Sequence, residues 1–220
     1  MNAKTKTILV AALAGLAVSI SVGYLLGAGM IGPRLESNRP ADVYGTVSVS
    51  NWNKPAPVYT INSTAGPVTI PVEGKVNVLL PQYVRCPDIC HLESQMMIYV
   101  MNRSIQEGWA DEVVWVTVEV DPWDGTPEMA VEYQKRVAKD LLDKVNWIWL
   151  FDSVEKMQEF YDAYGIYVEK AESGLVNHFG GFLIIDKNGV IRYIVHPDWN
   201  KVYDTAQVLY DKVVELVREG

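Results

Sequence analysis

Residues 76–91 read VNVLLPQYVRCPDICH, and this stretch decides the fold that the rest of the chain completes. Residues 76–80 are almost continuously apolar, which predicts a strand that is buried on both faces. The pattern of residues 91–106 suits an amphipathic helix, and Gly108 is placed to end it. The stretch therefore predicts a strand that leads through a pair of cysteines into a helix.

Further strands and helices are predicted on both sides of this stretch. Further strands are expected at residues 58–61, 68–71, 113–118, 147–150, 182–185 and 190–195, and further helices at 127–143, 153–163 and 204–218. Alternating buried strands and helices predict a mostly parallel sheet with both faces covered. The segment DKNG at residues 186–189 predicts a β-hairpin near the end of the chain. This is the layout of a thioredoxin-like α/β domain with an N-terminal β-hairpin insertion.

The beginning of the chain has a different character. Residues 8–33 contain no charged side chain, and about 20 apolar residues suffice for a helix that spans a bilayer. Lys4 and Lys6 precede the run, which favours keeping that end in the cytoplasm. We therefore expect a single-pass anchor in the cell membrane, with the soluble domain on the outer, extracytoplasmic face. A cleaved signal peptide is the alternative, although its apolar region is usually shorter.

Composition and charge exclude several classes of protein. The chain has 220 residues, of which 49% are hydrophobic and 21% charged, so a disordered or collagen-like chain is excluded. Its formal net charge is −8, and an acidic chain is a poor ligand for nucleic acid. We therefore expect no nucleic-acid partner. The domains are predicted as an anchor over residues 1–33, a linker over 34–55 that can include a short extended segment around residues 47–49, and the thioredoxin-like domain over 56–220.

Cys86 and Cys90 are the only cysteines of the chain, and three uses compete for them. A structural disulfide would close a very small loop and would add little stability. A redox-active pair suits the start of a helix: Pro87 favours the first turn, so we expect Cys86 at the cap and Cys90 one turn in, with both pKa values lowered. A soft metal ion is the third use, because residues four apart share one helix face.

A metal site would need a third ligand, and the chain has three histidines. His91 adjoins Cys90, and adjacent helical side chains point apart. His196 follows the last predicted strand. In a thioredoxin-like sheet, the segment before residues 182–185 packs against the helix that opens at the cysteines. This places His178 near both sulfur atoms and makes it the candidate third ligand.

Three segments in consistent order resemble the Sco/SenC family. They are CPDIC at residues 86–90, VTVEVDPWDGTPE at 116–128 and NHFGGFLIIDKNG at 177–189, within a likeness over roughly residues 55–215. The resemblance implies a thioredoxin-like fold and a copper site, for Cu(I) and also Cu(II), formed by Cys86, Cys90 and His178. It also implies delivery of copper to the dinuclear copper site in subunit II of cytochrome c oxidase, or reduction of the cysteines of that site.

The chain departs from the pattern of the family at three places. His91 replaces a usual proline, Asn177 replaces a usual aspartate, and Trp123-Asp124-Gly125 stand where the family usually has an Arg-Asp pair. The ligand set is intact, but the natural partner and redox properties are left open. A thiol–disulfide oxidoreductase and a redox or copper sensor remain alternatives to a copper chaperone.

Several other side chains are candidates for secondary roles. Met96, Met97 and Met101 follow the cysteines, and we expect them to fill the core rather than to bind copper. Trp123 is a candidate for contact with a partner, because exposed aromatic side chains recur at interfaces. Asp121 and Asp124 are either solvated loop acids or side chains that orient a ligand.

Overall fold

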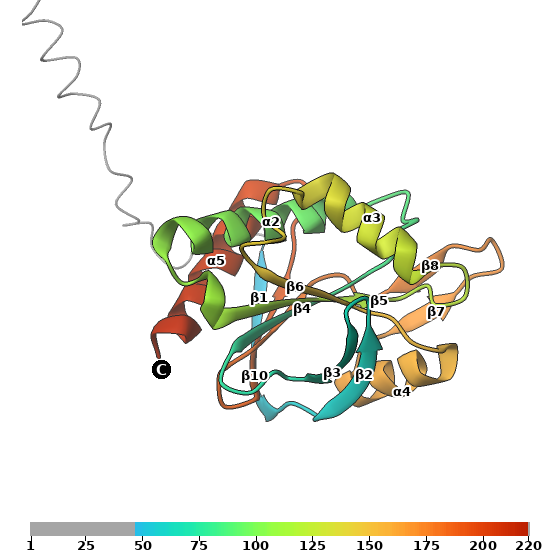
Figure 1. Cartoon of the computed structure of the whole chain (residues 1–220), viewed down its shortest axis with the longest axis horizontal. Coiled ribbons are helices and arrows are strands. Elements are labelled where there is room, and N and C mark those ends of the chain that lie inside the picture. Colours follow the sequence, from blue (N-terminus) through green and yellow to red (C-terminus); the bar gives the residue numbers. More distant parts are fainter. Residues whose placement is uncertain (1–46, 220) are drawn as a thin grey trace, which may run out of the picture. The chain divides into compact units, whose positions relative to one another are not determined.

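Three parallel strands form the centre of the sheet (Figure 1). The computed structural model describes residues 47–219. In it, β4 (Val76–Gln82) pairs with β5 (Val113–Glu119), which pairs with β6 (Asn146–Leu150). Every residue of β4 and β5 is buried, as their continuous apolar runs predict for strands covered on both faces.

The flanking strands are antiparallel. The sheet has the order β1-β10-β9-β4-β5-β6-β2-β3, with β2 (Tyr59–Ser63), β3 (Gly66–Ile70), β9 (Phe182–Ile185) and β10 (Val190–His196). The two predicted hairpins are confirmed. The prediction of a mostly parallel sheet is wrong, because strands and helices alternate only from β4 to β6 and the hairpins add antiparallel pairs on either side.

The first strand of the sheet lies in the segment that was predicted as a linker. The extended segment expected around residues 47–49 is the start of a longer strand, β1 (Ser48–Pro55), which pairs with β10 from Ser48 opposite His196 to Pro55 opposite Val190. The strand is mostly exposed, which is why its sequence lacks the alternation of apolar and polar residues that marks a half-buried strand. The predicted anchor lies outside the described residues. Within residues 47–219, no helix combines the length and the apolar composition that crossing a membrane requires.

Helices cover both faces of the sheet. The helices are α2 (Cys90–Glu107), α3 (Pro127–Ala138), α4 (Val154–Tyr164) and α5 (Val202–Arg218), with a short 3-10 turn, Ala110–Glu112. Helices α2, α3 and α5 lie on one side of the sheet and α4 lies on the other (Figure 1). Most buried side chains of the first three helices share one core cluster, and those of α4 belong to the other. The three methionines of α2 are fully buried, so their prediction as core residues is confirmed. Helix α3 ends at Ala138, five residues before its predicted end.

A second, two-stranded sheet precedes β9 and was not predicted. It joins β7 (Val168–Lys170) to β8 (Val176–His178) in antiparallel register, with Val168 opposite His178. The amide of Phe179 donates to the carbonyl oxygen of Tyr167 at 2.8 Å, which extends the pairing by one step. We call the segment from Tyr167 to Phe179 the histidine hairpin, because it carries His178.

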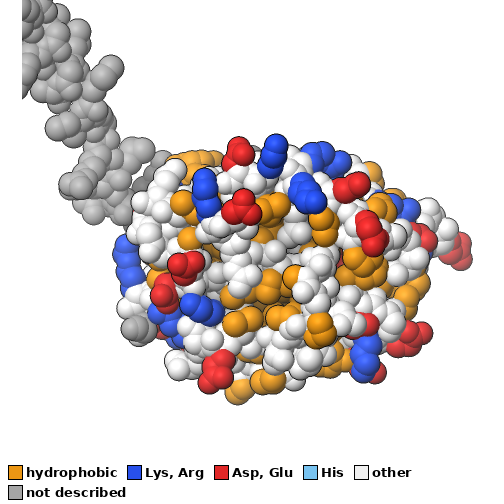
Figure 2. All heavy atoms as spheres, viewed as in Figure 1, with side chains coloured by type: hydrophobic (Ala, Val, Ile, Leu, Met, Phe, Trp, Pro, Cys, Tyr) orange, Lys and Arg blue, Asp and Glu red, His pale blue; other side chains and the backbone are white. Residues whose placement is uncertain are grey.

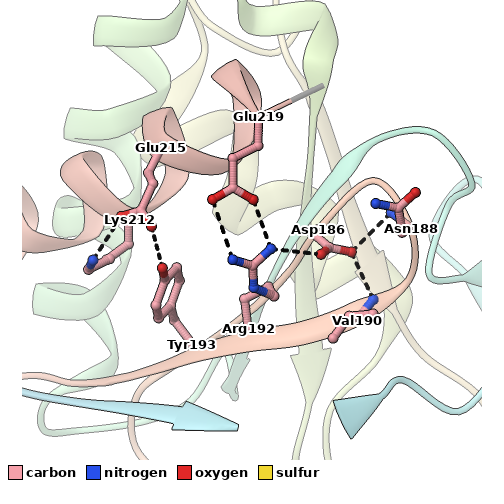
Figure 3. Close-up of polar contacts among 8 residues, drawn as sticks. All are labelled: Asp186, Asn188, Val190, Arg192, Tyr193, Lys212, Glu215 and Glu219. Atoms are coloured by element: carbon pink, nitrogen blue, oxygen red, sulfur yellow. Dashed lines mark hydrogen bonds and ion pairs between the residues drawn. The ribbon is translucent and has the colours of Figure 1, made fainter. Parts of the chain in front are cut away.

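The end of the chain is tied to the hairpin of β9 and β10 (Figure 3). Arg192 donates to Asp186 at 3.1 Å and to Glu219 at 2.8 Å. The carboxylate of Asp186 also accepts from the amides of Asn188 and Val190, which closes the predicted turn. On the face shown in Figure 2, acidic and basic side chains are interspersed with apolar ones.

Candidate metal centre

The two cysteines lie where β4 gives way to α2. The predicted helix cap at Cys86 is wrong: residues 83–89 form an irregular segment of turns and bends, and the helix begins at Cys90 with Ile89 at its N-cap. Cys86 is half-buried in this turn, Cys90 is 3% exposed, and both are free thiols. The pair therefore consists of one accessible sulfur and one buried sulfur.

The pKa values of these two thiols are shifted in opposite directions. A hydrogen bond from Cys90 lowers the pKa of Cys86 to about 5, and the amides of Asp88 and Cys90 act in the same direction. The same hydrogen bond, together with burial, raises the pKa of Cys90. Cys86 is thus the thiolate at neutral pH and Cys90 the thiol that donates to it. The prediction of two lowered pKa values is wrong for Cys90, which lacks solvent to stabilise its charge.

His178 completes the site from the other side. Its Nε2 lies 3.8 Å from Cys90 Sγ, and its Nδ1 lies 2.8 Å from the carbonyl oxygen of Phe179. A carbonyl oxygen only accepts hydrogen bonds, so Nδ1 carries the proton. Burial lowers the pKa of His178, which favours the neutral ring. Nε2 is consequently the unprotonated ring nitrogen, and it can accept from the sulfur of Cys90.

The separation of this nitrogen and sulfur suits a shared metal ion. Metal–sulfur and metal–nitrogen bonds of about 2.3 and 2.0 Å, meeting at a trigonal angle, hold the two ligand atoms roughly 3.7 Å apart. Across residues 47–219, however, no group of three or more histidine, cysteine, aspartate or glutamate side chains is already arranged to hold a metal ion. The structure therefore brings Cys90 and His178 to a metal-binding distance and places Cys86 beside Cys90.

The other candidates lie apart from this centre. His91 is exposed on α2, as expected for a helix residue rather than a ligand. His196 ends β10 and packs edge-on against the ring of Phe179 at 5.6 Å between centroids. Asn177 is exposed on β8, where alternation along the strand turns it away from the side of His178.

A buried carboxyl group near the cysteines is not among the residues that the sequence indicates. Glu93 lies one turn after Cys90 on α2 and is fully buried, and its carboxylate oxygens make no hydrogen bond of normal geometry with another described residue. Burial raises the pKa of Glu93 to about 8, and the nearby Trp199 side chain partly offsets this effect. A Cβ atom on Gly180 would lie 3.3 Å from Glu93 Oε1, so this glycine leaves room for the carboxyl group. The available signal in the sequence is a carboxylate three residues after a candidate ligand, on the same helix face.

Charged side chains also lie next to the cysteine turn. Asp121 is buried and accepts from Arg85 at 2.6 Å, while Asp124 is about half exposed and pairs with both Arg85 and Lys170. Neither acid is therefore a simple solvated loop residue. Trp123, the candidate partner contact, is 38% exposed next to them.

Comparison with known proteins gives a consistent result. The family model SCO1/SenC matches residues 60–213. A comparison with curated protein sequences gave no match. Among solved structures, a SCO1/SenC family lipoprotein from Bacillus anthracis is 22% identical, with a TM-score of 0.63 over 76% of this chain and 97% of that chain.

Two further structures share the fold. ScoI of Arabidopsis thaliana, solved with copper bound, is 24% identical, with a TM-score of 0.59 over 75% of this chain and 99% of that one. BsSco, a member of the Sco family of cytochrome c oxidase assembly proteins in which a disulfide switch was identified, is 19% identical, with a TM-score of 0.61 over 77% and 96%. These likenesses confirm the thioredoxin-like α/β domain of this family.

Proposed function

The chain belongs to the SCO1/SenC family, and from this premise we propose that it binds copper through Cys86, Cys90 and His178. The observation that carries the proposal is the orientation of His178, whose Nδ1 is held by a backbone carbonyl while Nε2 faces Cys90 Sγ. Thiolate and imidazole ligands together favour Cu(I) and also accommodate Cu(II). The copper-bound structure of the Arabidopsis relative supports the choice of metal.

We treat copper as cargo that the protein takes up and passes on. Because the three ligands are not prearranged, the turn that carries Cys86 is the part that adjusts when copper binds. Binding deprotonates Cys90, so one proton is released for each copper that enters the thiolate pair. The accessible Cys86 is then the ligand that an acceptor thiol or imidazole displaces first.

The acceptor that we propose is the dinuclear copper site in subunit II of cytochrome c oxidase. The family link of BsSco to assembly of that oxidase supports this choice. We further propose that residues 1–33 anchor the chain in the cell membrane with the domain on the extracytoplasmic face. The uncharged run of residues 8–33, with Lys4 and Lys6 before it, supports this orientation.

Copper titration of the full chain, reduced and held in detergent, tests the ligand set. We expect about one copper per chain, retained against a competing chelator. His178→Ala removes a ligand, so its effect should exceed the 10–100-fold loss that is typical when only a partner of a ligand is removed. His91→Ala, an exposed histidine next to the same cysteine, is the matched control and should retain copper. Equal retention by His178→Ala and the wild type would contradict the proposal.

A second function is favoured by the pKa of Cys86. A half-buried thiolate beside a buried thiol is suited to reduce a disulfide of the acceptor. The Cys86 thiolate attacks one acceptor sulfur and releases the other as a thiolate; Cys90 then loses its proton and attacks Cys86 Sγ. The acceptor leaves with both cysteines reduced, and Cys86 and Cys90 leave as a disulfide. If this function dominates, Cys86→Ser abolishes acceptor reduction while His178→Ala leaves it intact.

A further inference from the structure

Three segments that surround the cysteine pair meet at one carboxylate. Asp124 Oδ2 lies 2.8 Å from Arg85 Nη2 and 2.8 Å from Lys170 Nζ. Arg85 immediately precedes Cys86, Asp124 lies in the loop between β5 and α3, and Lys170 ends β7. Asp121 contacts the same two cations, at 2.6 Å from Arg85 Nη2 and at 3.9 Å from Lys170 Nζ. Asp124 makes the shorter contact with Lys170 and is therefore the closer connection between the cysteine turn and the histidine hairpin.

The connection continues through the hairpin to the histidine. Lys170 pairs with Val176 in the register of β7 and β8, and His178 lies two residues further along the same strand. The Phe179 amide is held by the Tyr167 carbonyl, so the end of β8 cannot shift without loss of a hydrogen bond. Fixing Lys170 thus fixes the strand from which His178 extends.

The loop that presents Asp124 is itself closely packed. The amide of Gly125 donates to the carbonyl oxygen of Asp121 at 2.9 Å, and a Cβ atom on Gly125 would lie only 2.9 Å from that oxygen. The backbone amide of Asp121 donates to the buried carboxylate of Glu119 at 2.9 Å, and its own carboxylate accepts from Arg85. Asp124 is consequently presented from a loop that is tied to the end of β5.

We propose that Asp124 is a positioning residue of the metal centre, which sets the separation between the cysteine turn and the histidine hairpin. This inference rests on the proposed copper site, because the positioning acts on its ligands. Asp124 does not touch the ligand atoms. It acts through Arg85 on the position of Cys86 and through Lys170 on that of His178.

Ion pairs this exposed contribute little to global stability. Asp124 is 45% exposed, Arg85 42% and Lys170 29%. A positioning role therefore predicts a local effect on the hairpin and the site without a matching loss of global stability. A purely structural role predicts instead a loss of global stability without a separate effect on the hairpin and the site.

The test compares Asp124→Asn, which removes the charge but keeps the size, with Asp124→Glu, which keeps the charge. Glu159→Gln is the matched control, since it breaks the exposed Lys156–Glu159 pair of 2.7 Å on α4. All variants are made in the full chain. Three quantities are measured: the amide hydrogen exchange of residues 168–179 without copper, Cu(I) retention against a chelator, and the midpoint of urea unfolding.

In Asp124→Asn, we expect the hairpin amides to exchange their hydrogens severalfold faster than in the wild type. The variant should bind copper about 10–100-fold more weakly, while the midpoint of its urea unfolding stays unchanged. Asp124→Glu should recover most of both losses, and Glu159→Gln should match the wild type. Unchanged exchange in Asp124→Asn, or unchanged copper retention despite faster exchange, would overturn the inference. If the wild type itself retains no copper, the proposed function fails, and the exchange data alone decide whether Asp124 fixes the hairpin.

Discussion

At the scale of single residues, the protonation of three side chains determines what the site can bind. Cys86 is a thiolate because Cys90 donates to it, and His178 is a neutral ring because it is buried and its Nδ1 proton is engaged by a carbonyl. The site therefore presents one negative sulfur, one protonated sulfur and one free nitrogen lone pair. This set favours a soft cation and predicts the release of one proton on binding.

The buried carboxyl group of Glu93 predicts that the stability of the fold depends on pH. Its pKa is about 8 in the folded chain and 4.5 in the unfolded one, so the folded state binds more protons between these two values. Stability must then fall as pH rises through that window. Each pKa unit corresponds to about 1.4 kcal/mol. We expect Glu93→Gln to be more stable than the wild type by roughly 2–4 kcal/mol at pH 8 and nearly equal to it at pH 5.

Urea unfolding of the two proteins at pH 5 and pH 8 measures this difference. Glu132→Gln, which changes an exposed glutamate on α3, serves as the control and should show no such pH dependence. A stability difference between Glu93→Gln and the wild type that does not change between the two pH values would contradict the account of this residue.

At the scale of elements, the site lies at the carboxyl ends of the parallel strands. The cysteine turn follows β4 and the Asp121–Gly125 loop follows β5, so both leave the same edge of the sheet. The histidine hairpin enters the same region immediately before β9. Connections at this edge commonly carry the functional groups of open α/β sheets.

Two glycines close to His178 in the sequence should differ in how much stability an alanine substitution costs. Gly181 has φ +139°, and a Cβ atom there would lie 2.6 Å from the carbonyl oxygen of Val195. Gly174, in the turn of the same hairpin, has φ +84° and no atom within 4 Å of such a Cβ. Gly174→Ala should cost about 1–2 kcal/mol for the backbone conformation alone. Gly181→Ala adds an overpacking cost of about 1–3 kcal/mol.

Urea unfolding of these two variants separates the backbone cost from the steric cost. Because the backbone of β10 cannot easily move, Gly181→Ala should also weaken copper binding, whereas Gly174→Ala should not. Equal stability of the two variants would show that the close approach at Gly181 is relieved by a small shift.

The elements that could be predicted from the sequence are those with a strong periodic pattern. Buried strands such as β5 and the hairpin around residues 186–189 were predicted within a residue or two. The helix predicted over residues 91–106 agrees with α2 within one residue at each end. The cap expected at Cys86 is wrong, because the preference of proline for a first turn does not show that Cys86 accepts hydrogen bonds from the amides of Asp88 and Cys90. Strands β7 and β8 have three residues each, too few for any period to show.

Some residues of the candidate site could also be predicted from the sequence, and others could not. His178 could be predicted from its order relative to the strands and from the family resemblance. The pairing of Asp124 with Lys170 spans 46 residues and depends on where the loop after β5 meets the end of β7, which no local pattern encodes. The burial of Glu93 likewise depends on packing against Gly180 and Trp199, which adjoin it only in the folded chain.

At the scale of the whole molecule, the proposed function requires the domain to lie outside the cytoplasm. In right-side-out membrane vesicles, a membrane-impermeant maleimide should label the full chain at Cys86, whose thiolate is accessible. Cys86→Ser should prevent labelling, since Cys90 is buried and its pKa is raised. Labelling in inside-out vesicles alone would contradict the proposed orientation.

The central claim is that copper is held by two sulfur atoms and one imidazole nitrogen. X-ray absorption at the copper edge of the Cu(I)-loaded, full-length protein counts these neighbours directly, with His178→Ala and His91→Ala measured alongside. We predict two sulfur neighbours and one nitrogen neighbour in the wild type and in His91→Ala, and loss of the imidazole signal in His178→Ala. A spectrum that His178→Ala leaves unchanged, or one with a single sulfur neighbour in the wild type, would contradict the account.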